Sequence, residues 1–560
     1  MGKFNLIEEP WISVLTDEKG TTKEVSLIDL FENANQYKDL AGDSPTQNFA
    51  VLRVLLAILH TVFSRFDADG QPYHYFKIDD RLRQISTIDE EDVEDYSEDL
   101  YRNWNQMWQN KEFADIIYQY LNIWHDRFYL FDDKLPFYQV TEAVIAPDKI
   151  SRKKASFVSG KTINRLVSES GNKNKIALFS PKHSSNKEIL TAPEIARWLV
   201  TYQGYSGLSD KAIFGKEKYK SSKGWLFDIG GVFLKGNNLC ETLLLNLVLV
   251  HPKSEYIGYK QKPCWEYSSQ DIVDRSFSIN KVNNIAELYT NWSRAIYIDP
   301  ETDISKAFSF NTVKLTDIDH QDQFLEPMTI WRYNKSGENK GKHTPRKHQA
   351  EQSVWRSFGL ITLPNSYKED QERPSIINWI DNISESINNF DMTIESVSMK
   401  HDGKPISWLP VDEIYDSLKI NDLVLTDSAD DGWLIRINEA VDRTKEVIGG
   451  TYRRFLVDVR NIRKLDSNHQ FVNRGVEDLY YAIDQPFREW LSSIKPTDSK
   501  REKISQWYNS LDKIVDNHAE KVLENATYRD YIGIKSEDQE NKGANIITAY
   551  NKFKYFLNKQ

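Results

Sequence analysis

Histidine followed by aspartate is the pattern in this sequence that comes nearest to catalytic chemistry. It occurs twice, as His125-Asp126 and His401-Asp402. A metal-dependent hydrolase would need further His and Asp ligands on neighbouring elements, and the sequence contains no phosphate-binding loop, nucleophile elbow or HExxH motif. The second pair precedes Gly403 among alternating residues, which is typical of a tight β-hairpin turn. We therefore expect a binding protein without a catalytic site, and a nuclease or hydrolase that uses both pairs is one alternative.

Cysteine is too rare for a disulfide framework or a cysteine-rich metal cluster. The chain has only Cys240 and Cys264, which fits a reducing cytosol. The N-terminus lacks the apolar run of a signal peptide, and no stretch approaches 18 uncharged apolar residues. We expect a cytoplasmic protein with no membrane partner, no metal and no cofactor.

Positive charge is concentrated in three segments of an acidic chain. The net charge is −11 over 560 residues, yet residues 149–187, 201–224 and 332–347 together carry +17. These segments are rich in Gly, Ser and Asn, whereas residues 89–99 hold eight acids and no base. Solvated loops are the simpler interpretation of any single run. Three basic runs on an acidic body indicate a surface for a polyanion such as nucleic acid.

The elements that must position these segments begin with a buried helix over residues 44–66. Ser44 is a good N-cap, Pro45 suits the first helical position, and the apolar residues cover nearly the whole circumference. Further elements are expected as helices over 100–125 and 191–203, a long loop over about 149–190, and a strand-rich region over 290–410.

The chain becomes helical after about residue 427. Amphipathic segments with short connections lie at 430–462, 475–494, 499–527 and 545–558, with a break or kink at Gly449-Gly450. This pattern predicts an antiparallel four-helix bundle, which is most often an interaction module. The expected fold class is α+β, with a mixed α/β N-terminal domain at residues 1–425 that carries nucleic-acid-binding loops and a four-helix bundle at 426–560.

Several stretches, in order along essentially the whole chain, resemble one family. They are "FNLIEEPWISVL" at the start, "GDSPTQNFAVLRVLLAILH" at 42–60, the "TYQGYSGLSDK" loop, "FLKGNNLCETLLLNLV", "EQSVWRSFGLI" at 351–361 and the helical end. They are similar to the CasA family, whose members are the large subunits of the type I-E CRISPR surveillance complex Cascade. The resemblance implies a non-catalytic subunit beside the 5′ handle of the guide RNA. Such a subunit recognises a short motif that flanks a double-stranded DNA target, helps to part the strands, and docks the helicase–nuclease.

The family's glycine-rich loop, which contacts the flanking motif, maps onto the segment that starts at Gln203. The residues implied in DNA binding are Gln203, Gly204, Ser206, Gly207, Ser209, Lys211, Lys216 and Lys218. Serine or aspartate stands where glycine is expected at positions 206, 209 and 210. Glycine lets backbone groups approach the floor of the minor groove, whose degenerate code tolerates several motifs, and lysines hold the flanking phosphates.

The family also inserts a hairpin between the DNA strands, typically tipped with a glutamine. The matching tip here is His401, Asp402, Gly403, Lys404 and Pro405, and it contains no glutamine. A stiff Lys-Pro hairpin can still fill the gap left by parted bases, as apolar wedges do. The family lysine that contacts the flanking motif falls near Lys314.

The loop that family members extend towards the guide RNA maps near residues 178–190. There the resemblance implies that Phe179 stacks on a base and that Lys182, His183 and Lys187 pair with phosphates. Some relatives carry a cysteine-ligated zinc, which two cysteines cannot supply. The implied partners are target DNA, the guide RNA 5′ handle, other Cascade subunits and the helicase–nuclease. The other alternative is a scaffold that contacts only guide RNA and neighbouring subunits.

Overall fold

The computed structural model describes residues 2–164, 181–279, 281–365, 370–466, 470–534 and 544–559. The chain divides into two compact units. The first comprises Met1–Glu351, Asn365–Ile387 and Met392–Ser417, and the second comprises Gln352–Pro364, Asn388–Asp391 and Leu418–Gln560. The sequence analysis expected the domain boundary after residue 425. The long segment of the second unit begins a few residues earlier, at Leu418, and this unit also includes the two short segments Gln352–Pro364 and Asn388–Asp391.

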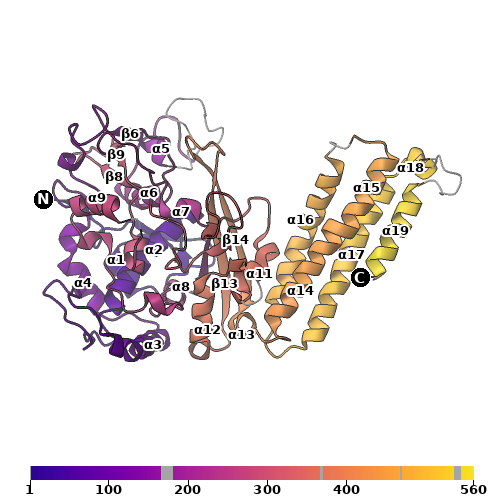
Figure 1. Ribbon diagram of the computed structural model, residues 1–560, viewed down its shortest axis with the longest axis horizontal. Helices are drawn as coiled ribbons and strands as arrows, with labels where there is room; N and C mark the ends of the chain where they lie inside the picture. Colours follow the sequence, from indigo (N-terminus) through magenta and orange to yellow (C-terminus); the bar gives the residue numbers. More distant parts are fainter. Residues whose placement is uncertain are drawn as a thin grey trace. The chain divides into compact units, whose positions relative to one another are not determined.

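The first unit combines helices with small sheets, which confirms the mixed α and β class (Figure 1). In strand order the sheets are β1–β5, β3–β2–β4, β6–β9–β8, β11–β10–β12 and β14–β13–β7. The strands are β1 (Lys3–Asn5), β2 (Ile12–Leu15), β3 (Thr22–Val25), β4 (Asp39–Leu40), β5 (Tyr129–Phe131), β6 (Ser156–Ser159), β7 (Gly231–Lys235), β8 (Arg294–Tyr297), β9 (Ser309–Lys314), β10 (Ile330–Tyr333), β11 (His343–Arg346), β12 (Gln371–Glu372), β13 (Asp391–His401) and β14 (Pro410–Asn421). The helices are α1 (Leu27–Glu32), α2 (Pro45–Phe63), α3 (Val93–Asn110), α4 (Ile116–Ile123), α5 (Gly160–Ile163), α6 (Ala192–Gly204), α7 (Trp225–Asp228), α8 (Leu239–Leu245), α9 (Ser269–Ser278), α10 (Ile285–Tyr289) and α12 (Ser375–Ile387).

Helix α2 forms the centre of this core, as the sequence predicted. The Ser44 hydroxyl accepts a hydrogen bond from the Gln47 amide at 3.3 Å, and Pro45 occupies the first turn. The Gln47 side chain accepts from the amide of Asp43 at 2.8 Å, one residue before the position a capping box would use. The helix is long and apolar enough to cross a membrane, but 94% of its apolar 18-residue stretch is buried within the protein. It is therefore accounted for as a core helix.

Two of the expected elements differ from the structure. The helix expected over 100–125 is two helices, α3 and α4, because the backbone at Lys111 turns into the left-handed region with φ 56° and ends α3. The loop expected over 149–190 carries β6 and α5 in its described part, since β6 pairs antiparallel with β9. Helix α6 is confirmed, with a capping box between Thr191 and Glu194.

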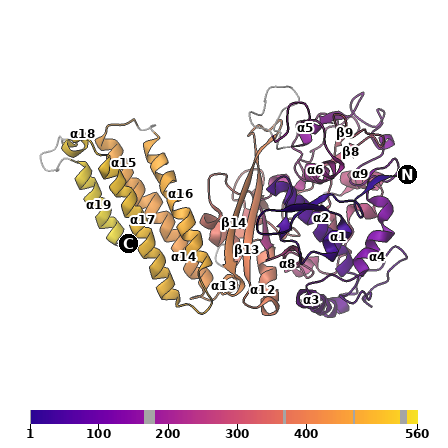
Figure 2. The same ribbon diagram turned by 180° about the vertical axis from the view of Figure 1, so that it is seen from behind.

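The second unit contains the helical C-terminal region. Its helices are α11 (Phe358–Thr362), α13 (Asp422–Leu425), α14 (Trp433–Glu446), α15 (Arg453–Ile462), α16 (Phe471–Ser492), α17 (Lys500–Glu524), α18 (Tyr528–Ile532) and α19 (Ile546–Lys559). The two glycines at 449 and 450 lie in a π-helical segment, η8 (Val447–Tyr452), which joins α14 to α15 without a break. The long helices pack side by side, α15 against α16 and α19, and α17 against α14, α16 and α19 (Figures 1 and 2).

Candidate nucleic-acid interface

Gln203 lies in the last turn of helix α6 and is buried at the start of the candidate DNA-binding loop, which spans residues 203–211. Its amide nitrogen donates to the carbonyls of Tyr138 at 3.3 Å and Arg294 at 3.0 Å. Its oxygen accepts from the amides of Ser293 at 2.9 Å and Arg294 at 3.0 Å. The side chain therefore joins the loop to β8 and is not exposed to a ligand, so the role it can play is to position the loop.

The small residues that follow are also buried. A Cβ on Gly204 would lie 2.8 Å from a methyl group of Leu226, and Ser206 shares a 3.1 Å hydrogen bond with Ser293. Gly207 has φ +71°, and a Cβ there would lie 2.7 Å from the Trp408 carbonyl oxygen. Any larger residue at 207 would be both strained and in collision with the neighbouring backbone. Small size at these positions allows close packing of the loop.

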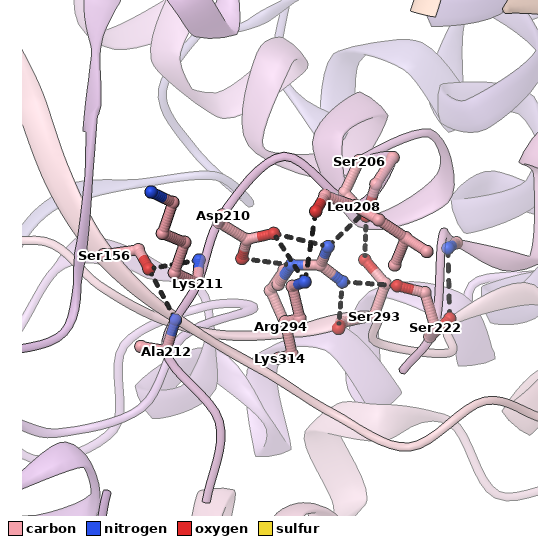
Figure 3. A network of polar contacts seen from close by, with 12 residues as sticks. Ser156, Ser206, Leu208, Asp210, Lys211, Ala212, Ser222, Ser293, Arg294 and Lys314 are labelled. Atoms are coloured by element: carbon pink, nitrogen blue, oxygen red, sulfur yellow. Dashed lines mark hydrogen bonds and ion pairs between the residues drawn. The ribbon is translucent and has the colours of Figure 1, made fainter. Parts of the chain in front are cut away.

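Arg294 holds the far end of the loop through a buried network (Figure 3). Its guanidinium donates to both carboxylate oxygens of Asp210, at 2.8 and 2.9 Å. It also donates to the carbonyls of Gly207 at 2.5 Å, Ser222 at 2.6 Å and Ser293 at 2.8 Å. Because the Arg294 guanidinium makes all five of these hydrogen bonds, it fixes the path of the backbone from residue 207 to residue 210.

Lys314, the lysine that the family resemblance singled out, belongs to the same network (Figure 3). Its ammonium donates to the Leu208 carbonyl at 3.1 Å and lies 3.9 Å from the Asp210 carboxylate. Burial lowers its pKa, and the charge of Asp210 opposes that shift. In this conformation Lys314 helps to hold the loop in place through its contacts with Leu208 and Asp210.

The exposed part of the predicted site is Ser209 with Lys211, Lys216 and Lys218. Within the described ranges, these three lysines have no carboxylate partner. The Lys211 side chain points away from the Arg294 network (Figure 3). Unpaired, solvated ammonium groups of this kind are available to phosphates without breaking an internal bond.

The predicted hairpin is present, as β13 and β14 joined by residues 402–409 (Figure 2). The connection is longer than the expected tight turn. Asp402 folds it, because its carboxylate accepts from the amides of Lys404 and Leu409, each at 3.1 Å, and from the Ser407 hydroxyl at 2.9 Å. The Nδ1 atom of the His401 ring accepts a hydrogen bond from the Gly403 amide at 3.0 Å. The second His-Asp pair thus builds a turn.

The hairpin and the DNA-binding loop form one surface. The Leu208 amide donates to the Ser407 carbonyl at 2.7 Å, and the close approach of Gly207 to Trp408 lies beside it. On its other flank the hairpin is tied to α2, because Glu413 accepts from the hydroxyl of Thr46 at 2.7 Å and from its amide at 3.2 Å. Two segments about 200 residues apart are therefore held in a fixed relation.

The exposed tip of the hairpin contains an apolar residue that sequence reasoning missed. Gly403, Lys404 and Pro405 are exposed as expected, and Ile406 beyond them is 93% exposed. An isoleucine in a polar turn directly after proline is the signal that could have identified it. The tip therefore presents two exposed apolar side chains in succession, Pro405 and Ile406.

A cationic cluster lies at the base of the hairpin. The ammonium groups of Lys223 and Lys347 lie 5.4 and 4.2 Å from the centre of the Phe227 ring, and Lys223 also bonds Asp228 at 2.7 Å. Burial lowers the pKa of Lys347 to about 8. Burial also lowers the pKa of His401, and the two lysines add to that effect. Lys223 and Lys347 carry two positive charges and Asp228 carries one negative charge, so the base of the hairpin has a positive charge at neutral pH.

The segment expected near the guide RNA is only partly described. Phe179 lies outside the described residues. Lys182 is occupied, since its ammonium bonds Glu194 at 2.7 Å and the Ile189 carbonyl at 2.7 Å. His183 is exposed and bonds the Ser185 hydroxyl at 2.8 Å, and Lys187 is half-buried. Of these side chains, His183 is the one the structure leaves most open to solvent.

The remaining His-Asp pair is engaged in local contacts. His125 lies 3.2 Å from Glu8 and within 3.4 Å of the Asn5 amide, while Asp126 contacts Arg81 at 3.4 Å. Cys240 and Cys264 are both buried free thiols. Among the residues described, no group of three or more His, Cys, Asp or Glu side chains is arranged to hold a metal ion.

Comparison with known proteins identifies relatives over most of the chain. The family model for the CRISPR-associated protein Cse1 matches residues 5–517. The CRISPR-associated protein CasA/Cse1 of Thermus thermophilus is 27% identical over 366 residues, which cover 64% of this chain and 60% of that protein. The match thus spans less than two thirds of that relative's length.

Solved structures share the fold from end to end. The crystal structure of Thermobifida fusca Cse1 has a TM-score of 0.77 at 22% identity and covers 100% of this chain and 98% of its own. The Cse1 structure from Acidimicrobium ferrooxidans has a TM-score of 0.72 at 19% identity, with the same coverage of 100% and 98%. A chain of a CRISPR RNA-guided surveillance complex has a TM-score of 0.67 at 16% identity and is covered completely. By its match to the family model over nearly its whole length, the chain belongs to the CRISPR-associated Cse1, or CasA, family.

Proposed function

We propose that this chain is the large, non-catalytic subunit of a cytoplasmic CRISPR RNA-guided surveillance complex. In this role it recognises a short motif that flanks a target in double-stranded DNA and helps to part the strands there. Its partners are target DNA, the 5′ handle of the guide RNA, the other Cascade subunits and the helicase–nuclease that is recruited for antiviral defence. Membership of the Cse1 family and the likeness to a chain of a surveillance complex support this assignment.

The observation that carries the proposal is the contact between the DNA-binding loop and the hairpin. The 2.7 Å bond from Leu208 to Ser407 places a tightly braced backbone loop next to an exposed apolar tip, Ile406. A rigid loop suits recognition of the minor groove, and an apolar side chain beside it suits insertion between base pairs. Lys211, Lys216 and Lys218 supply charge for the phosphates of the same duplex.

The buried residues of the loop act by positioning it. In this proposal Gln203, Gly204, Ser206, Gly207 and Lys314 keep the loop in shape, and Ser209 with backbone groups nearby makes the contacts. The helical C-terminal region, folded as a four-helix bundle, serves neighbouring subunits. His183 and Lys187, with Phe179, face the guide RNA.

Assembly of the complete complex with charge-reversed lysines tests the proposal. The variant Lys211→Glu/Lys216→Glu/Lys218→Glu should assemble with guide RNA normally and bind a motif-bearing duplex at least tenfold more weakly at low salt, because each lost phosphate contact removes counterion release. Unchanged duplex affinity with normal assembly would instead favour a scaffold that touches only guide RNA and its neighbours. Metal-dependent cleavage by the isolated chain would support the hydrolase alternative.

A further inference from the structure

Strands β6, β9 and β8 form one small sheet (Figure 1). This sheet carries an aromatic residue that is exposed to solvent. Phe157 on β6 is 70% exposed, and it pairs across the sheet with Asn311 on β9, which pairs in turn with Tyr297 on β8. Residues opposite one another on neighbouring strands point to the same face, with Cβ atoms about 5 Å apart. Phe157, Asn311 and Tyr297 therefore form one row across an open sheet face.

Phe157 and Asn311 have no internal task in the described part of the structure. The Phe157 ring has no aromatic or cationic neighbour there at contact distance, and the Asn311 amide has no hydrogen-bond partner among the described side chains and backbone. Most of the apolar surface of the Phe157 ring stays in contact with water in the folded chain, so this surface contributes no hydrophobic stabilisation to folding. A flat apolar ring beside a free amide is suited to stacking and edge recognition of a planar polar molecule.

Positive charge surrounds the Phe157 end of the row. Lys149, Arg152, Lys153 and Lys154 precede β6, are exposed, and have no carboxylate partner among the described residues. They are joined to the lysine-bearing segment 211–218 by a bridge between Ile150 and Phe214 and by bonds from the Lys211 and Ala212 amides to the Ser156 hydroxyl, at 3.0 and 2.9 Å (Figure 3). The two basic runs that are separate in the sequence thus meet beside Phe157.

Negative charge lies at the opposite end of the row. Glu142 and Asp299 are near enough to Tyr297 to raise the pKa of its hydroxyl, after the larger effect of burial. The row is therefore polarised, with cations at Phe157 and acids at Tyr297. An anionic ligand is directed to the Phe157 and Asn311 end, where one planar group can be accommodated.

We propose that Phe157 and Asn311 form a binding site for an unpaired nucleotide of a single-stranded nucleic acid. The base stacks on Phe157, the Asn311 amide bonds its edge, and the cations at 149–154 and Lys211 hold the adjacent phosphates. A duplex cannot use this site, because its base faces are already stacked within the helix. The site goes beyond the duplex recognition proposed above. It shares Lys211 with the loop 203–211, but Phe157 and Asn311, which contact the base, lie outside both that loop and the hairpin.

Fluorescence anisotropy of the full chain with labelled twelve-nucleotide probes tests the site. One probe is single-stranded DNA, one is single-stranded RNA of the same sequence, and one is a blunt DNA duplex. Phe157→Ala should weaken binding of at least one single-stranded probe by roughly tenfold or more, the effect typical of losing one stacking contact. Phe157→Trp should retain the affinity, and Asn311→Ala should reduce the difference in affinity among probes that vary in one base.

Tyr481→Ala is the matched control, because Tyr481 is 86% exposed on α16 in the second unit. It should leave every affinity unchanged, and Phe157→Ala should melt at the temperature of the wild type. The probe that loses affinity shows whether the strand is DNA or RNA, and either result supports the site. Unchanged affinity of Phe157→Ala for both single strands, or an equal loss on the blunt duplex, would overturn it, whatever the outcome for the flanking-motif duplex.

Discussion

Replacement of Arg294 by lysine tests whether the buried network braces the candidate DNA-binding loop. Arg294 donates five hydrogen bonds, to Asp210, Gly207, Ser222 and Ser293. A lysine ammonium has three donors, so at least two buried acceptors lose their partner. At about 1–3 kcal/mol for each buried acceptor left unsatisfied, Arg294→Lys should lower the free energy of unfolding by about 2–6 kcal/mol. That is a large share of the roughly 5–15 kcal/mol of a typical domain.

Denaturant unfolding measures this loss, and amide hydrogen exchange locates it. Exchange should accelerate at Gly207 and Leu208, whose amides donate to the Lys223 and Ser407 carbonyls. Arg102→Lys is the matched control, since the Arg102 side chain is 74% exposed and pairs only with Asp99 at 2.6 Å in the described structure, so its replacement should cost less than about 0.5 kcal/mol. The reasoning is refuted if both variants are equally stable and the exchange of residues 205–212 is unchanged.

Further predictions concern the charges, the hairpin tip and one buried acid. Reversal of Lys211, Lys216 and Lys218 to glutamate should make the dependence of log affinity on log salt shallower by about 2–3, as measured by duplex titrations at several salt concentrations. Ile406→Ser should reduce strand opening beside the motif roughly tenfold, read from 2-aminopurine fluorescence, with little change in duplex affinity. Burial raises the pKa of Glu395 from its ordinary 4.5 to about 7. The contribution of Glu395 to the free energy of unfolding should therefore fall by about 3 kcal/mol as pH rises from 4.5 to 7, because the folded state keeps a proton that the unfolded chain releases. The difference in stability between the wild type and Glu395→Gln, measured by denaturant titrations, should change by that amount over the same range.

Each of these results has a contrary outcome. A salt dependence identical to the wild type would remove the three lysines from the phosphate contacts. Normal strand opening by Ile406→Ser would mean that another residue of the hairpin parts the bases. A pH profile that Glu395→Gln does not alter would show that the acid is ionised in the folded state at acidic pH.

The sequence predicted elements whose signals are local. Ser44, Pro45 and the uninterrupted apolar run define α2 within a few residues, and Thr191 with Glu194 defines the start of α6. The hairpin at Asp402 was likewise predicted from its neighbours, although its connection is longer than the expected tight turn. Local chemistry failed at Lys111, where a lysine adopts the left-handed backbone that usually marks glycine or asparagine, so the end of α3 had no sequence signal.

Long-range pairing could not be predicted, and it determines most of the candidate site. Arg294 is an ordinary arginine in the sequence, and only the fold brings it to Asp210, 84 positions away. The same is true of Gln203, which the family resemblance implied in DNA binding but whose side chain is bonded to the backbone of β8. Phe157 and Asn311 meet only because β6 pairs with β9. A single sequence carries no record of such partners.

The most direct test of the central claim is the binding of the reconstituted, guide-loaded complex to a duplex library randomised beside a constant target. The account predicts enrichment of a small set of flanking motifs by the wild type. The enrichment should flatten when Gly207 is replaced by valine, which collides with the Trp408 backbone, while pairing with the guide is retained. Equal recovery of all flanking sequences by the wild type, or enrichment that is unchanged with a disrupted loop and hairpin, would contradict it.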